Sequence, residues 1–207
     1  MLNKIRDFLD FVGLQYRNPD KAGAEREKML ELRHKGQEAR KAFTELAKAF
    51  QESHPEWQLQ QTSQWMNQAQ RLRPHFWIYL QRDGQVTEPM MALRLYGSPS
   101  DFGVSLEVSF IERKKDEQTL GKQAEVLEIP AVEGIYYLAY SDGQSQRWEA
   151  NEENRKILVE KVSSQEIRKV LVKVDVSFVE IQSLEVILEK LEEAYERLLP
   201  YYHATRE

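Results

Sequence analysis

The sequence has no cysteine among its 207 residues, which excludes disulfide bonds, thiolate zinc sites and thiol nucleophiles. Long apolar runs are also missing, and no stretch approaches the roughly 20 apolar residues of a membrane-spanning helix. Segment 1–13 carries Lys4, Arg6 and Asp7 among its apolar residues, so it lacks the continuous apolar core of a signal peptide. We therefore expect a cytoplasmic protein that is neither secreted nor inserted in a membrane.

An excess of positive charge is absent as well. The chain carries 29 basic and 34 acidic residues, mixed along its length, for a formal net charge of -5. Without a broad positive field, the chain has little to hold a phosphate backbone. Nucleic acid is therefore not an expected partner.

The common catalytic motifs are missing too. No serine elbow, phosphate-binding loop or dinucleotide glycine loop occurs, and the four histidines stand far apart with no helical i, i+4 pair. Asp101 and Glu112-Arg-Lys114 have the residue types of a magnesium-dependent nuclease, but one extended strand would hold the carboxylates about 35 Å apart. The sequence therefore predicts no catalytic residue, no metal ligand and no cofactor.

Two helical stripes are present, one towards each end of the chain. Asn18-Pro19 is typical of a helix start, and a long helix is expected from there to about Pro55. Pro200 is expected to end the last helix. Steps of three and four define the stripes, which comprise Met29, Leu32, Gly36, Ala39, Phe43, Leu46 and Phe50 in the first and Leu184, Leu188, Leu191, Tyr195, Leu198 and Tyr202 in the second. The stripes predict that the terminal helices pair with each other or lie on a sheet within one chain. The alternative is that the stripes form a coiled coil between chains, in a homodimer or with another protein partner.

Alternating patterns between the helices predict about five strands, the first three in a meander. A short helix is expected over 151–162 and a charged loop over 113–124. The expected strands are 75–81, 90–96, 103–111, 135–140 and 170–178. The fold class is thus α+β, a single domain over 1–207 with a helical part (1–54), a mainly antiparallel sheet (55–180) and a C-terminal helix (181–207).

Strand alternation places polar and aromatic residues on one face of this meander, opposite a wholly apolar face. The candidate binding residues on the mixed face are His75, Trp77, Tyr79, Arg94 and Glu107. Arg94 would anchor an anion, Trp77 or Tyr79 would stack on a ring, and His75 with Glu107 would exchange a proton. The structural alternative is a cross-strand ion pair of Arg94 and Glu107, with the aromatic rings packed beneath a helix.

These observations favour a binding or interaction protein without catalytic activity. The alternative is a small enzyme that acts on an anionic or aromatic metabolite at the mixed face, with His75 and Glu107 as proton-transfer groups. Binding of single-stranded RNA through Trp77 and Tyr79 is a third possibility, but the surrounding lysines that it needs are missing.

Two segments carry a resemblance to a known family. Residues 72–80 read Leu-Arg-Pro-His-Phe-Trp-Ile-Tyr-Leu, and residues 195–202 read Tyr-Glu-Arg-Leu-Leu-Pro-Tyr-Tyr. In both, the chain resembles the bacterial YktB-like family, some members of which bear a legacy glucose-6-phosphate dehydrogenase label. The resemblance implies a small cytoplasmic α+β protein of unknown activity, without catalytic residues to carry over. Leu120-Gly-Lys-Gln123 matches part of that dehydrogenase signature but lacks the preceding histidine, and it is expected to form a loop turn.

Overall fold

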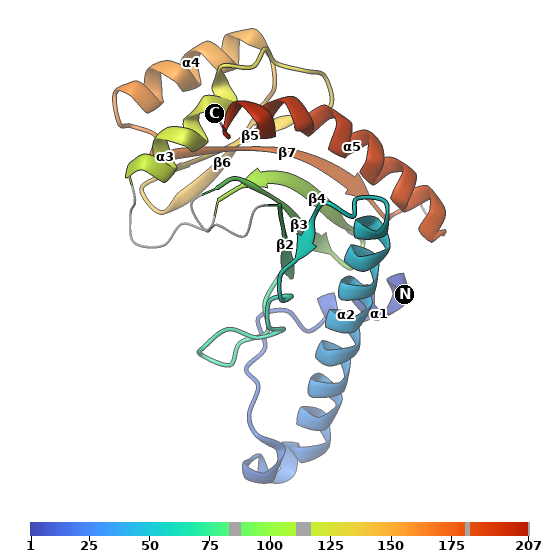
Figure 1. Cartoon of the computed structure of the whole chain (residues 1–207). Helices are drawn as coiled ribbons and strands as arrows, with labels where there is room; N and C mark the ends of the chain where they lie inside the picture. The colour runs from blue at the N-terminus through green and yellow to red at the C-terminus, as the bar shows by residue number, and fades with distance from the viewer. Residues whose placement is uncertain (83–87, 111–116, 181–182, 207) are drawn as a thin grey trace. The chain divides into compact units, whose positions relative to one another are not determined.

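In the computed structural model, the described residues are 1–82, 88–110, 117–180 and 183–206. They form two compact units. The first unit comprises Met1–Tyr79, Leu93–Val104 and Ser177–Leu188, and the second comprises Leu80–Ala92, Ser105–Val176 and Glu189–Glu207. The elements, labelled in Figure 1, are α1 (Leu2–Leu9), η1 (Pro19–Lys21), η2 (Gly23–Glu25), α2 (Arg26–Glu52), β1 (Gln58–Leu59), β2 (Trp77–Gln81), β3 (Met90–Ser98), β4 (Asp101–Ser109), α3 (Glu117–Ala124), η3 (Glu125–Leu127), β5 (Tyr136–Ser141), β6 (Gln144–Glu149), α4 (Glu152–Ser163), β7 (Lys169–Ser177) and α5 (Leu184–Ala204).

The α+β class and the antiparallel sheet are confirmed, but the expected number of strands is wrong. The sheet has seven strands in the order β1-β2-β3-β4-β7-β5-β6, so the predicted meander of β2, β3 and β4 is present. Strand β1 is too short, at two residues, to leave an alternating pattern. Strand β6 reads QSQRWE and is largely exposed, so it carries no apolar alternation to reveal it.

The first unit buries the N-terminal helical stripe within itself. Helix α1 packs against α2, and all seven stripe residues of α2 are buried. Phe76 stacks on Phe8 at 5.1 Å between ring centroids and lies 5.9 Å from Phe43. Since this stripe is covered within one chain, it offers no free seam for an intermolecular coiled coil.

Helix α2 begins later than the sequence predicts. The Asn18 side chain accepts a hydrogen bond from the Asp20 amide, but it caps the 3₁₀ turn η1 and not an α-helix. A second 3₁₀ turn, η2, opens with Gly23 at φ +55°, outside the helical region, so regular α-helix starts at Arg26.

In the second unit, α3, α4 and the C-terminal part of α5 lie over one face of β5, β6 and β7 (Figure 1). Strand β5 pairs antiparallel with both β6 and β7. Asp142 and Gly143 both have positive φ, as a two-residue hairpin turn of the primed type requires. The predicted short helix over 151–162 is confirmed as α4, which the Asn151 side chain caps at the Asn154 amide, 2.8 Å away.

Two further expectations fail here. Residues 117–124 form α3 and not part of a loop, so Leu120-Gly-Lys-Gln123 is helical. Residues 113–116 and Glu112 lie outside the described residues, and so does Asp83-Gly84, a pair that is typical of a turn after the strand 75–81. Pro200 does not end α5, which continues to Ala204. A helix-interior proline costs about 3 kcal/mol, but full burial of Tyr201 and Tyr202 returns about 4 kcal/mol each.

Candidate functional site

Trp77, the first residue of β2, lies at the centre of a cationic and aromatic cluster in the first unit. The guanidinium carbon of Arg73 is 4.7 Å from the centre of the Trp77 ring, and that of Arg94 is 5.5 Å away. The His75 ring lies 5.7 Å from the same ring. We call Arg73, His75, Trp77 and Arg94 the Trp77 cluster; all four residues are half-buried.

The backbone on either side fixes the position of this ring. The Trp77 amide donates to the Ser63 hydroxyl at 3.0 Å, and the Ser63 amide donates to the Trp77 carbonyl at 2.9 Å. Ile78 and Leu80 point into the core, so Trp77 and Tyr79 share the opposite, half-buried face of β2. Strand alternation thus brings three of the predicted site residues, His75, Trp77 and Arg94, into one cluster.

Trp77 makes contacts that the sequence did not predict. Two guanidinium groups lie over its indole ring, attracted by the negative charge of the ring face. The ring therefore holds the side chains of Arg73 and Arg94 in place. The N–H groups of their guanidiniums are then the donors that can bind an anion. Arg73 was not among the predicted site residues, because the predicted strand began at His75. The Arg73 Nε also donates to the Met66 carbonyl at 3.1 Å, which fixes the side chain further.

Glu107, the fifth predicted residue, belongs to the second unit. It is fully buried in β4, and its carboxylate accepts from the Lys173 ammonium at 2.9 Å; the Lys173 side chain is 7% exposed. Lys173 was not among the predicted partners of Glu107. A fully buried carboxylate that is paired with an ammonium group in this way favours a structural role over proton transfer.

A second polar group surrounds Tyr136 on strands β5, β6 and β7. The Tyr136 hydroxyl donates to one carboxylate oxygen of Asp175 at 2.8 Å, and Arg147 donates to the other at 2.8 Å. The Arg147 guanidinium carbon lies 3.6 Å from the centre of the Tyr136 ring. Burial, together with the charge of Asp175, raises the pKa of Tyr136 far above its usual range. The Tyr136 hydroxyl and the Arg147 guanidinium thus donate hydrogen bonds to the two oxygens of the Asp175 carboxylate, and Tyr136 stays protonated.

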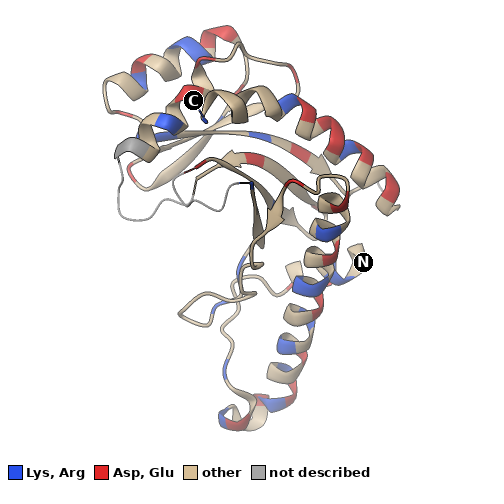
Figure 2. Cartoon of the chain, viewed as in Figure 1, with Lys and Arg blue, Asp and Glu red and all other residues tan. Residues whose placement is uncertain are grey.

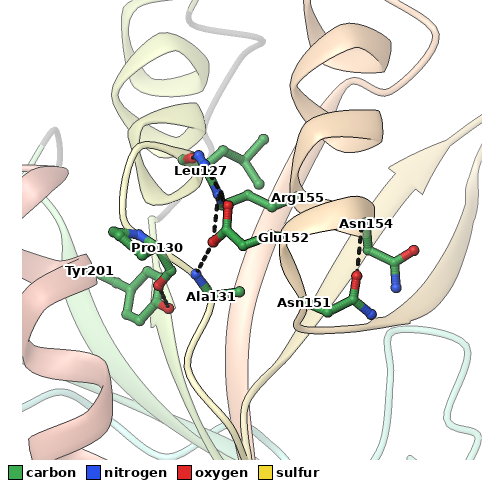
Figure 3. A network of polar contacts seen from close by, with 8 residues as sticks. All are labelled: Leu127, Pro130, Ala131, Asn151, Glu152, Asn154, Arg155 and Tyr201. Carbon is green, nitrogen blue, oxygen red and sulfur yellow. Dashed lines mark hydrogen bonds and ion pairs between the residues drawn. The ribbon is translucent and has the colours of Figure 1, made fainter.

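A third polar group ties the loop after η3 to helices α4 and α5 (Figure 3). Arg155 donates to the Glu152 carboxylate at 2.8 Å and to the Leu127 carbonyl at 2.7 Å. Glu152 also accepts from the Ala131 amide at 2.8 Å, and the hydrogen bond from Arg155 is the main cause that lowers the pKa of Glu152. The Tyr201 hydroxyl donates to the Pro130 carbonyl at 2.8 Å. This network fastens the loop and exposes no unused acid or base.

Tyr137 differs from its neighbours because its buried hydroxyl has no hydrogen-bond partner among the described residues. Burial raises its pKa to about 12, while the charge of Arg155 opposes this shift. An unsatisfied buried hydroxyl costs stability.

Metal, membrane and charge features give no further site in the described part of the chain. Within residues 1–82, 88–110, 117–180 and 183–206, no three His, Cys, Asp or Glu residues gather as a metal ion would require. None of the described helices combines the length and the apolar character needed to cross a membrane. Figure 2 shows Lys and Arg interspersed with Asp and Glu along α2, α4 and α5.

The Trp77 cluster therefore remains the best candidate among the predicted residues. It offers positively charged donors beside aromatic rings in a half-buried setting. No family model and no curated protein matches this chain.

Proposed function

We propose that this chain is a cytoplasmic binding protein without catalytic activity, and that its Trp77 cluster binds a small organic anion carrying an aromatic ring. The observation that carries the proposal is the placement of two guanidinium groups, from Arg73 and Arg94, over one half-buried indole. The resemblance to the bacterial YktB-like family is consistent with such a protein and stays part of the proposal.

Preorganisation is the physical reason for expecting a ligand there. A mobile arginine side chain on a protein surface loses conformational entropy when it binds a ligand. An arginine side chain that is already stacked on a ring has lost part of that entropy before the ligand binds. The N–H edges of a guanidinium fit carboxylate and phosphate groups, and its plane stacks on aromatic rings. His75, in the cluster, and Tyr79, next along the same face of β2, supply ring surface beside the charges.

The non-catalytic part of the proposal is supported by Glu107. The enzyme alternative needs this carboxylate to exchange a proton with His75, but Glu107 is fully buried and holds an ion pair with Lys173. Removal of the Lys173 charge or exposure of Glu107 would be required before the carboxylate could act on a ligand.

Isothermal titration with phenyl phosphate, inorganic phosphate and phenol tests the proposal. Phenyl phosphate should bind more tightly than either of its parts, because it uses both the charges and the rings. Arg73→Gln and Arg94→Gln should each weaken its binding by about tenfold, as expected for loss of a charge-assisted hydrogen bond. Arg33→Gln, at an exposed position of α2, is the matched control and should leave the affinity unchanged.

Trp77→Leu should weaken phenyl phosphate binding as strongly as either arginine variant, since it removes the support of both guanidinium groups. Its unfolding midpoint shows whether the fold is kept. Equal affinity for phenol and phenyl phosphate, or full affinity in a folded Trp77→Leu protein, would contradict the binding proposal. Turnover of an aromatic anion that is lost in His75→Ala would contradict the non-catalytic part.

A further inference from the structure

The first unit contains a cavity of about 700 Å³ that is separate from the Trp77 cluster. Its lining comes from α1, the turn between β3 and β4, the start of β4, the residues that follow β7 and the first turn of α5. The volume is within the range of about 300–1,000 Å³ that is usual for small-molecule sites.

Aromatic side chains form the buried part of this lining. The rings of Phe102 and Phe178 meet edge to face at 5.7 Å, and each residue is at most 5% exposed. The Phe178 amide donates to the Phe102 carbonyl at 2.8 Å, which fixes the two residues relative to each other. These side chains give the cavity an apolar wall of defined shape.

Other apolar side chains of the lining are left in water. Val179 is 54% exposed and Leu184 is 38% exposed, and both line the cavity. Exposed apolar surface at a concave site is typical of binding sites, because a ligand that covers it gains about 25 cal/mol per Å². An occupant with a hydrocarbon body is therefore favoured.

The charge of a side chain in the lining indicates the polarity of that occupant. Among the described residues that line the cavity, Arg6 alone has an ionisable side chain, and it donates to the Asn3 amide oxygen at 2.8 Å. Among the residues that the structure describes, Arg6 has no carboxylate partner. A guanidinium beside an apolar wall, without an acidic residue to neutralise it, is complementary to a single negative charge.

We infer that this cavity binds a singly charged organic anion with a hydrocarbon body, such as an aliphatic carboxylate. Arg6 pairs with the carboxylate, and Asn3 orients the guanidinium. The apolar chain lies against Phe102, Phe178 and Leu184. This inference does not depend on the proposed function of the Trp77 cluster, because the two sites share no residue.

Decanoate, used below its micelle concentration, is the probe, and decanol is its uncharged counterpart. Titration calorimetry should show saturable binding of decanoate that Arg6→Gln weakens about tenfold, while the weaker binding of decanol stays unchanged. Leu184→Asp should weaken both ligands, since it places a carboxylate in the apolar wall. Arg33→Gln serves again as the charge-matched control, and Trp77→Leu should leave decanoate binding intact.

Three results would overturn the inference. The first is an unchanged decanoate affinity in Arg6→Gln, and the second is equal affinity of the wild-type protein for decanol and decanoate. The third comes from cosedimentation with phosphatidylglycerol vesicles: binding to vesicles without binding to monomeric decanoate would assign the cavity to a lipid surface. Loss of phenyl phosphate binding in Trp77→Leu, with decanoate binding retained, would show that the two sites act separately.

Discussion

Replacement of Glu107 by Gln tests whether this residue stabilises the fold or performs chemistry. The substitution keeps the shape of the side chain but removes the charge that lies 2.9 Å from the Lys173 ammonium. With Glu107 fully buried and Lys173 only 7% exposed, water cannot replace the missing charge. Removal of one partner of a buried ion pair typically costs 3–5 kcal/mol, so we expect Glu107→Gln to lower the free energy of unfolding by about 3 kcal/mol.

A double-mutant cycle in urea measures this coupling. Glu107→Leu combined with Lys173→Met removes both charges and leaves apolar groups of similar size, so the double variant should be more stable than either single variant. Glu193→Gln, which removes an exposed partner of Arg197 on α5, is the control and should leave the midpoint unchanged. Simple additivity of the two single effects, or a loss below about 1 kcal/mol for Glu107→Gln, would refute the structural role.

Three further predictions concern packing and burial. Gly36→Ala in α2 should destabilise the protein by about 1–3 kcal/mol, since the new methyl group would lie 2.5 Å from the Trp65 ring. Gly121→Ala in α3, where no other atom lies within 4 Å of the new methyl group, should stabilise the protein by about 0.5–1 kcal/mol. Equal effects of the two substitutions on thermal unfolding would contradict this contrast. Tyr137→Phe should stabilise the protein by about 1 kcal/mol, because it removes a buried hydroxyl that has no hydrogen-bond partner. Tyr201→Phe should destabilise the protein by a similar amount, because it removes the hydrogen bond to the Pro130 carbonyl. Urea titrations measure the free energy of unfolding of both variants. The free energy of unfolding should fall as the pH rises from 10 to 12, because tyrosine in the unfolded chain ionises near pH 10 while folded Tyr137 keeps its proton to about pH 12. Tyr137→Phe should make the free energy of unfolding depend less steeply on pH in this range. An unchanged dependence would contradict the raised pKa of Tyr137.

Periodicity alone predicted much of the fold. Every residue of the α2 stripe is buried, and the apolar set of the meander, from Phe76 to Phe110, is buried as well. These predictions succeed because burial requires one apolar face, and the spacing of apolar residues records that face in the sequence. The short helix over 151–162 was also predicted, because a helix start such as the Asn151 cap depends on residues that are close in sequence.

The elements that the sequence analysis missed have weak local signals. Strand β6 forms because β5 supplies its hydrogen-bond partners, and all of its own residues except Trp148 are polar. Helix α5 passes through Pro200 because the buried tyrosines beyond it outweigh the lost hydrogen bond. In both places a tertiary interaction overrides the local preference.

For the candidate site, alternation along β2 and β3 placed His75, Trp77 and Arg94 on one face, and this followed from the sequence by itself. Only the tertiary structure decided what those residues touch: Arg73 joins the cluster from outside the predicted strand, and Lys173 takes Glu107 as its partner. The physical reason is that alternation fixes which way a side chain points within its own strand. Which charge meets it across the sheet depends on strand order and register, and those are properties of the folded chain.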